Sequence, residues 1–141
     1  MSGFLIDTNV ISELARPKPA PGVIAFFQRE TNFWLSVITL HELAYGAERV
    51  PDPARKTKLL AWIAEINAEF GSRILPLDTE TAENAGRLRA LANAQGRPAE
   101  PLDALIAATA LSHGSTLVTR NTKDFAVFAI RLVNPWGGSG H

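Results

Sequence analysis

The sequence predicts an α/β protein, a three-layer α/β/α sandwich with a central, mostly parallel sheet. Short segments rich in β-branched and aromatic residues alternate with longer segments whose apolar residues recur at helical spacing. Strands that are separated by helices form parallel crossovers, and these place helices on both faces of a sheet. We expect strands at Gly3 to Ile6, Phe33 to Ser36, Ile74 to Leu77, Thr116 to Thr119 and Arg131 to Val133.

Two of the expected helices have clear start and stop signals. The longer one runs from Ala54 to Phe70, and Gly71 follows it as a typical C-terminal stop. Its apolar stripe consists of Leu59, Ile63, Ile66 and Phe70. The other runs from Thr79 to Ala94, begins after Asp78 as its N-cap and ends before Gly96. The residues expected to face inward on it are Ala85, Leu88 and Ala92.

Two more helices carry acidic residues near their starts. One covers Leu102 to His113, with Pro101 before it and Gly114 after it. The other follows the second strand, where Thr39 and Glu42 have the spacing of a capping box. Both starts are expected at the end of the sheet where the strands end.

Length and composition predict a protein that folds on its hydrophobic core alone. The chain has 141 residues, which fits a single domain over residues 1–136, and residues 137–141 are expected to be a flexible tail or a cloning remnant. It has no cysteine, which excludes disulfides and cysteine-bound zinc and fits a cytoplasmic protein. The start of the chain has neither the basic region of a signal peptide nor an apolar run long enough for a membrane anchor.

The overall charge does not indicate nucleic-acid binding. Fourteen Lys and Arg residues balance fourteen Asp and Glu residues, so no net field attracts a polyanion to the chain. A hypothesis of nucleic-acid chemistry must therefore rest on local sites.

Four acidic residues are expected to meet at one edge of the sheet. Asp7 follows the first strand, Glu42 lies in the helix after the second, Asp103 opens a later helix, and Asp124 lies shortly after the fourth strand. Parallel α/β sheets bind ligands outside the carboxyl ends of their strands. Four carboxylates at one place repel one another unless divalent cations compensate them. The pattern predicts a site for one or two Mg²⁺ or Mn²⁺ ions.

Phosphodiester hydrolysis is the reaction that such a site favours. Hard divalent ions bind oxygen ligands and keep waters, one of which can become the attacking hydroxide. His41 is the only histidine near these acids in the sequence, and neither a catalytic triad nor a glycine-rich phosphate loop can be assembled.

Each acid also has a structural interpretation that remains open. Glu42 fits the capping box, while Asp103 and Asp124 fit acidic positions that a helix dipole favours. Asp7 favours function most, because a carboxylate at the end of a central strand is costly without a partner. The joint placement of the four acids carries the metal hypothesis.

The chain resembles PIN-domain ribonucleases, specifically the VapC/FitB-like toxins of bacterial type II toxin–antitoxin systems. The matching segments are Phe4 to Glu13, Leu35 to Leu43 with Gly46, Leu102 to Ala110, and Leu117 to Phe125. The resemblance implies a metal-dependent endoribonuclease whose catalytic and metal-binding residues are Asp7, Glu42, Asp103 and Asp124. The residues expected to support them are Thr8, Asn9, Thr119 and Asn121.

The resemblance also implies partners. The first is a cognate antitoxin whose C-terminal segment lies over the acidic groove and inserts an Arg or Lys. The second is another copy of the chain in a homodimer, for which the apolar candidates are Trp34, Trp62 and the Tyr45 region. The third is the RNA, for which the candidate basic residues are Arg16, Lys18, Arg120 and Lys123. No membrane partner is expected.

Two features depart from the pattern or lie outside it. The stretch Arg97 to Pro101 is richer in proline than the family leads us to expect, and within it Glu100 is interpreted as a rim charge rather than an additional site acid. Glu13 is interpreted as a surface residue rather than a ligand.

Two other functions compete with the ribonuclease. A phosphatase of the haloacid dehalogenase type also places its nucleophile after the first strand, but it requires a second Asp where this chain has Asn9. A catalytically silent domain that binds a partner through its acidic pocket is the non-enzymatic alternative.

Overall fold

The computed structural model describes residues 3–137, and its strands form one parallel sheet. All five predicted strands are present, although the third is two residues shorter than expected. They are β1 (Phe4–Ile6), β2 (Phe33–Ser36), β3 (Ile74–Leu75), β4 (Thr116–Val118) and β5 (Leu132–Val133). All four neighbouring pairs are parallel, in the order β3-β2-β1-β4-β5. Of the predicted tail, residues 138–141 lie outside the described residues.

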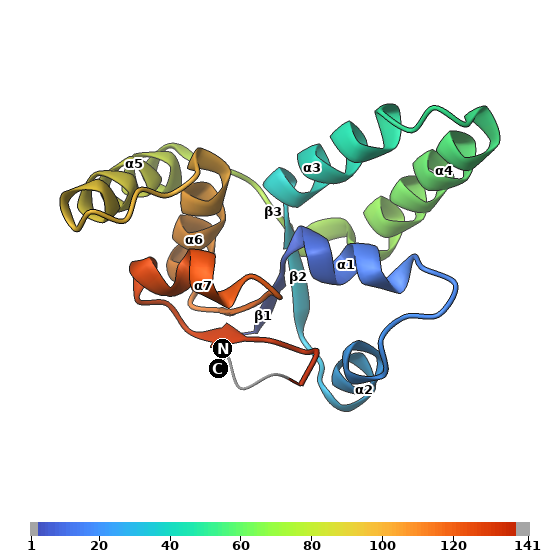
Figure 1. Ribbon diagram of the computed structural model, residues 1–141, viewed down its shortest axis with the longest axis horizontal. Coiled ribbons are helices and arrows are strands. Elements are labelled where there is room, and N and C mark those ends of the chain that lie inside the picture. Colours follow the sequence, from blue (N-terminus) through green and yellow to red (C-terminus); the bar gives the residue numbers. More distant parts are fainter. Residues whose placement is uncertain (1–2, 138–141) are drawn as a thin grey trace.

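Helices occupy both faces of the sheet, which confirms the predicted three layers (Figure 1). The α-helices are α1 (Thr8–Leu14), α2 (Pro21–Arg29), α3 (Val37–Glu48), α4 (Pro53–Phe70), α5 (Thr79–Ala94), α6 (Pro101–His113) and α7 (Thr122–Phe125). Two 3₁₀ turns, η1 (Gly71–Arg73) and η2 (Ala126–Phe128), follow α4 and α7. Among residues 3–137, no helix combines the length and the apolar composition that a membrane span requires.

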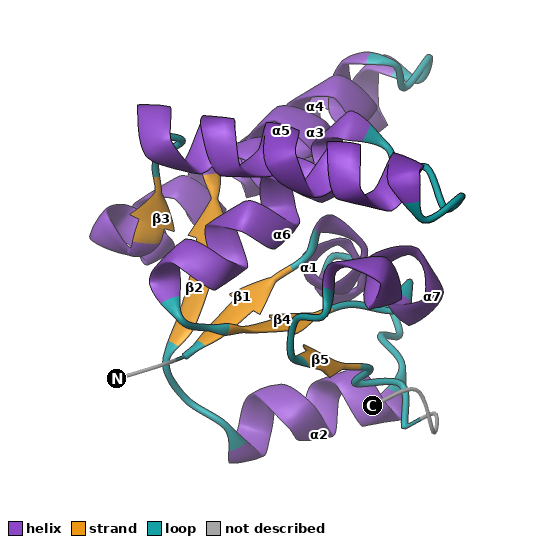
Figure 2. Cartoon of the chain, turned by 90° about the vertical axis from the view of Figure 1, so that its left-hand side faces the viewer, coloured by secondary structure: helices purple, strands orange, loops and turns teal. Residues whose placement is uncertain are grey.

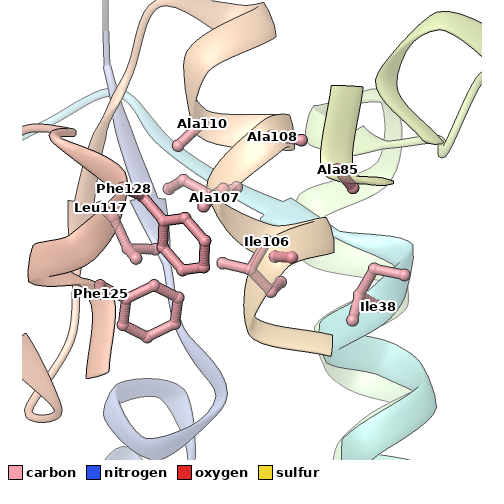
Figure 3. Close-up of a cluster of buried hydrophobic side chains, with 11 residues drawn as sticks. Ile38, Ala85, Ile106, Ala107, Ala108, Ala110, Leu117, Phe125 and Phe128 are labelled. Atoms are coloured by element: carbon pink, nitrogen blue, oxygen red, sulfur yellow. The ribbon is translucent and has the colours of Figure 1, made fainter. Parts of the chain in front are cut away.

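The alternation of side chains along the strands divides the core in two. Leu5 and Leu117 face a cluster built with α5, α6, α7 and η2, whereas Ile6 and Val118 face a cluster built with α1 to α4. In Figure 3 the rings of the α7 and η2 phenylalanines lie beside Leu117, and the small residues of α6 lie beside them. Each layer of helices is therefore held by its own set of strand residues.

Short side chains let α6 lie close to its neighbours. The buried alanines of α6 are Ala104, Ala107, Ala108 and Ala110. Ala85 and Ala92 of α5 are also buried, and the partly buried Leu88 packs against the same cluster, as the sequence predicts. This packing positions the start of α6, and with it Asp103.

The predicted helix ends are confirmed at three places and wrong at one. Asp78 caps α5 by accepting a hydrogen bond from the Thr81 N–H at 2.8 Å, and Gly71 and Gly114 end their helices with positive φ. The cap of α3, however, is Ser36, whose hydroxyl accepts from the Ile38 N–H at 3.0 Å. Thr39 lies inside the helix, so the capping-box interpretation of Glu42 is wrong.

The order of the strands reverses between β1 and β4. The chain moves outward from β1 to β2 and β3, then returns to the other side of β1 for β4 and β5. The segments that leave β1 and β4 therefore diverge to opposite faces, and in Figure 2 α1 and α7 both lie beyond the carboxyl ends of these strands. Parallel sheets bind ligands at such a switch point.

We expect Gly22→Ala to destabilise the protein. A Cβ on Gly22, in the first turn of α2, would lie 2.5 Å from the carbonyl oxygen of Pro135, so the backbone must shift. Overpacking of this kind costs about 1 to 3 kcal/mol. Gly86→Ala is the matched control, because open space surrounds that helical position and alanine is favoured there by about 0.5 to 1 kcal/mol. Urea unfolding of both variants measures the difference, and equal stabilities would contradict the close approach.

Candidate active site

Asp7 lies at the switch point and is fixed from three directions. It is the N-cap of α1 directly after β1, and only 6% of its surface is exposed. One carboxylate oxygen accepts the Thr8 N–H at 2.9 Å. The other accepts the Thr119 hydroxyl at 2.8 Å and the Asn9 amide at 3.1 Å. The carboxylate is thus held in one orientation by β4 as well as by its own helix.

Thr119 is the centre of this hydrogen-bond network. It follows β4, is completely buried, and its hydroxyl oxygen accepts from the Asn121 N–H at 3.0 Å and from the Asn9 amide at 3.3 Å. The side-chain amide oxygen of Asn9 (Oδ1) in turn accepts the Arg120 N–H at 3.1 Å. Thr119 and Asn9 therefore tie the loop after β4 to Asp7, while Asn121 takes part through its main chain.

Glu42 approaches from α3, which belongs to the same helical layer as α1. It lies in the second turn of α3, is partly exposed, and its carboxylate accepts a hydrogen bond from the Thr8 hydroxyl. Since Thr8 also donates its N–H to Asp7, this one residue connects two of the four predicted site acids.

Asp103 and Asp124 lie on the other side of Asp7. Asp103 is in the first turn of α6 and Asp124 is in α7, and both line a cavity of about 400 Å³. Glu100, on the loop before α6, is exposed and lines the same cavity. The predicted acids thus come from the junction of β1 and α1 and from α3, α6 and α7, the helices that surround the strand ends in Figure 1.

The four acids are close enough to influence one another electrostatically. Burial raises the pKa of Asp7, hydrogen bonds from Thr119 and Thr8 oppose this rise, and the charge of Glu42 adds to it. Burial, together with the charges of the surrounding carboxylates, raises the pKa of Asp103 to about 6. Those carboxylates are Asp7, Asp124, Glu42 and Glu100.

The chemistry of these donors fits a hard divalent cation. Carboxylate and hydroxyl oxygens are the ligands that Mg²⁺ and Mn²⁺ prefer. A cation also relieves the repulsion that, after burial, contributes to the raised pKa of Asp103. Within residues 3–137, however, no three acidic or histidine side chains are already arranged as ligands of one ion. Of the four acids, only Asp7 and Glu42 are held by side-chain hydrogen bonds from the described part of the chain, so an ion would have to draw the side chains of Asp103 and Asp124 toward them.

A larger hollow of about 810 Å³ lies on the Glu42 side, between α1, α3 and α4. Thr8 and Glu42 line it, and its apolar walls include Trp62 and Ile63. The basic residues that line it are Arg16, Arg55 and Lys58. Of the other predicted RNA contacts, Arg120 stacks over the Trp136 ring at 4.7 Å, and Lys123 lines the smaller cavity beside Asp124.

Comparison with known proteins identifies the family. Residues 4–130 match the PIN domain. The chain belongs to the PIN domain family. It is 36% identical to the toxin FitB of Neisseria gonorrhoeae, with 94% of this chain and 98% of FitB covered. It is 34% identical to the tRNA(fMet)-specific endonuclease VapC of Shigella flexneri, with 89% and 91% covered.

Solved structures agree with this assignment. FitAcB from Neisseria gonorrhoeae superimposes with a TM-score of 0.89 at 35% identity, over 96% of this chain and 99% of the other. A toxin–antitoxin complex from Klebsiella pneumoniae gives a TM-score of 0.67 at 26% identity, over 93% and 96%. Membership of the PIN domain family excludes the haloacid dehalogenase hypothesis.

One buried acid of this PIN domain was misassigned from the sequence. Glu13 is 7% exposed, not a surface residue, and its carboxylate accepts the Ala20 N–H at 2.8 Å and pairs with Arg16 at 3.5 Å. It fastens the start of α2 to α1 and does not join the site. Six positions along a helix turn a side chain by about 240°, so the spacing of Glu13 from Asp7 gave no signal of this contact.

We expect Asp103→Asn to raise the melting temperature of the metal-free protein at about pH 8. There the Asp103 carboxylate is ionised among other carboxylates, and its folded-state pKa of about 6 lies above the ordinary value of 3.8. When the folded-state pKa of a group is raised, its contribution to stability is fully present below the unfolded-state pKa. That contribution is lost as the pH rises through the folded-state pKa. The gain should therefore vanish near pH 4.

Glu80→Gln is the matched control for this experiment. Glu80 is also an acid in the first turn of a helix, but it is exposed on α5 and only gains from the helix dipole. Its replacement should lower the melting temperature slightly at pH 8. If Asp103→Asn also lowered the melting temperature at pH 8, repulsion among the site acids would be absent.

Proposed function

We propose that this chain is a metal-dependent endoribonuclease and the toxin of a toxin–antitoxin pair. The placement of four acids around the β1–β4 switch point, one directly after β1 and three on different helices, carries this proposal. The relatives support it, because one of them is a toxin and another an endonuclease specific for tRNA(fMet). A cytoplasmic location fits the absence of cysteine and the nature of the substrate.

The residues of the site have distinct roles in this proposal. Asp7, Glu42, Asp103 and Asp124 hold one or two Mg²⁺ or Mn²⁺ ions, which when bound supply an activated water and neutralise charge on the phosphate. Thr119 and Asn9 keep the Asp7 carboxylate in one orientation, and Thr8 does the same for Glu42. Such support behind the ligands reduces the reorganisation that ion binding requires.

A partner protein that covers the site would regulate it. The toxin–antitoxin complex among the structural relatives supports a cognate antitoxin for this chain. A basic side chain placed between the carboxylates by that partner would form charge-assisted hydrogen bonds with them and exclude a metal ion. In the catalytically silent alternative, a partner would bind the acidic pocket in the same way, but the chain would have no ribonuclease activity for the partner to inhibit.

A homodimer is also part of the proposal. Of the three aromatic residues considered for the contact, Tyr45 is 60% exposed on α3, and Trp62 is only partly buried. Trp34 is less suitable, because its ring packs against His113 at 4.4 Å and its N–H donates to Asn32 at 2.7 Å.

The purified chain should cleave RNA in the presence of Mg²⁺ or Mn²⁺, and EDTA should stop the cleavage. Asp7→Asn should reduce the rate by more than about a hundredfold, because even residues behind a metal ligand contribute about 10- to 100-fold. A gel assay of tRNA and ribosomal RNA fragments measures this, with Glu80→Gln as a control that keeps its activity. Full activity of Asp7→Asn, or activity indifferent to EDTA, would rule out the mechanism.

The toxin role has a separate test. Induction of the gene in a bacterial host should arrest growth, and Asp7→Asn expressed to the same level should not. Co-expression of the protein encoded by the neighbouring short gene should restore growth and copurify with the chain. Normal growth with a demonstrably active enzyme would show that the protein is a ribonuclease without this role.

A further inference from the structure

We propose that the cavity between the loop 97–100 and α7 binds a backbone phosphate of the RNA through Arg97 and Lys123. This inference rests on the proposed ribonuclease function and adds a substrate-binding site to it. The phosphate bound here is a neighbour of the one that is cleaved. The loop is the proline-rich stretch that departs from the family pattern.

The cavity opens beside the acids of the site. Loop residues from Arg97 to Glu100 form one wall, and Lys123, Asp124 and Val127 form the other. Asp103 lines it as well, so an anion held in the cavity lies next to two of the four site acids. Its volume of about 400 Å³ falls in the range of ligand sites, which is about 300 to 1,000 Å³.

The loop holds the Arg97 main chain in a defined position. Gly96 leaves α5 with a φ of 72°, and the Arg97 N–H donates to the Ala92 carbonyl oxygen at 2.9 Å, which closes the helix end. Pro98 and Pro101 then restrict the backbone on the way to α6. A loop restrained in this way loses little conformational entropy when it binds a ligand.

Neither cation is engaged by the acids around it. Glu100, Asp103 and Asp124 line the same cavity, yet within residues 3–137 neither Arg97 nor Lys123 belongs to any of the three ion pairs. Two positive side chains of one cavity that lack a carboxylate partner are available for a bound anion. Arg and Lys are the residues that most often contact nucleic-acid phosphates.

The lining favours a phosphate over a base. Unpaired bases bind by stacking on aromatic rings, and among the described residues that line this cavity none is aromatic. The larger hollow on the Glu42 side differs, because Trp62 lines it. The chain has no net positive charge, and the acids of its site repel the RNA backbone. Arg97 and Lys123 would offset this repulsion locally by binding phosphates.

The test separates RNA binding from RNA cleavage. Arg97→Ala, Lys123→Ala and the double variant are compared with Arg89→Ala, which removes an exposed arginine of α5 outside the cavity. Binding of a fluorescent single-stranded tRNA fragment is measured in EDTA at several salt concentrations, and its cleavage is measured with Mn²⁺. Thermal unfolding verifies that every variant is folded.

We expect each single variant to weaken RNA binding and raise KM by roughly five- to tenfold, about the contribution of one exposed hydrogen bond. The value of kcat should change by less than about twofold. The slope of the logarithm of affinity against that of salt should fall by about 0.7 for each lost contact to single-stranded RNA. Arg89→Ala should behave as the wild type. Arg97→Lys should recover part of the loss, because it keeps the charge but not the paired donors.

Each contrary outcome has its own meaning. If Arg97→Ala and Lys123→Ala match Arg89→Ala in affinity and salt dependence while the wild type cleaves RNA, the phosphate site is wrong and the proposed function stands. If the wild type binds RNA with the expected dependence on both residues but never cleaves it, the site stands and the ribonuclease fails. If these variants keep RNA binding but no longer bind a protein partner, Arg97 and Lys123 bind an acidic segment of that partner and the inference is overturned.

Discussion

The hydrogen bond from the Thr119 hydroxyl to the Asp7 carboxylate is the interaction on which the site depends. It joins the ends of β1 and β4, the two strands between which the order of the sheet reverses. A carboxylate buried at this point is stable only with donors around it, and here they come from Thr8, Asn9 and Thr119. The same donors connect the loop after β4 to α1, so the fold and the site share one set of contacts.

The other acids are placed by the helices that the switch point separates. Because α3 belongs to one layer and α6 and α7 to the other, Glu42 and the pair Asp103 and Asp124 approach Asp7 from opposite sides. Packing of the α6 alanines against their neighbours holds Asp103 in place although burial and nearby charges raise its pKa. The core therefore maintains an arrangement of charges that is unfavourable in itself, which is typical of sites built for function.

Much of this architecture was predictable because its signals are local. The five strands, the cap at Asp78 and the stops at Gly71 and Gly114 each follow from a few neighbouring residues. The convergence of the four acids was predictable too, since parallel strands all end at the same edge. Their role as metal ligands remains a prediction, supported by the chemistry of the donors.

What could not be predicted depends on contacts between distant segments or on small shifts in register. Ser36 and Thr39 are both good caps, and only the length of β2 decides that the helix begins after Ser36. Glu13 looks like a surface acid until α2 returns and presents the Ala20 N–H to it. The link from Thr8 to Glu42 joins residues 34 positions apart, and no local pattern encodes it.

The arrangement of charge explains how a chain without net charge can act on a polyanion. The acids are concentrated at the strand ends, while the two hollows beside them carry cations, Arg97 and Lys123 on one side and Arg16, Arg55 and Lys58 on the other. Attraction from these cations is local and is screened over about 8 to 10 Å in physiological salt. RNA would therefore be held only where its backbone spans both hollows and crosses the acids between them. Selectivity would then come from the shape of the RNA that can bridge this distance rather than from overall electrostatic attraction.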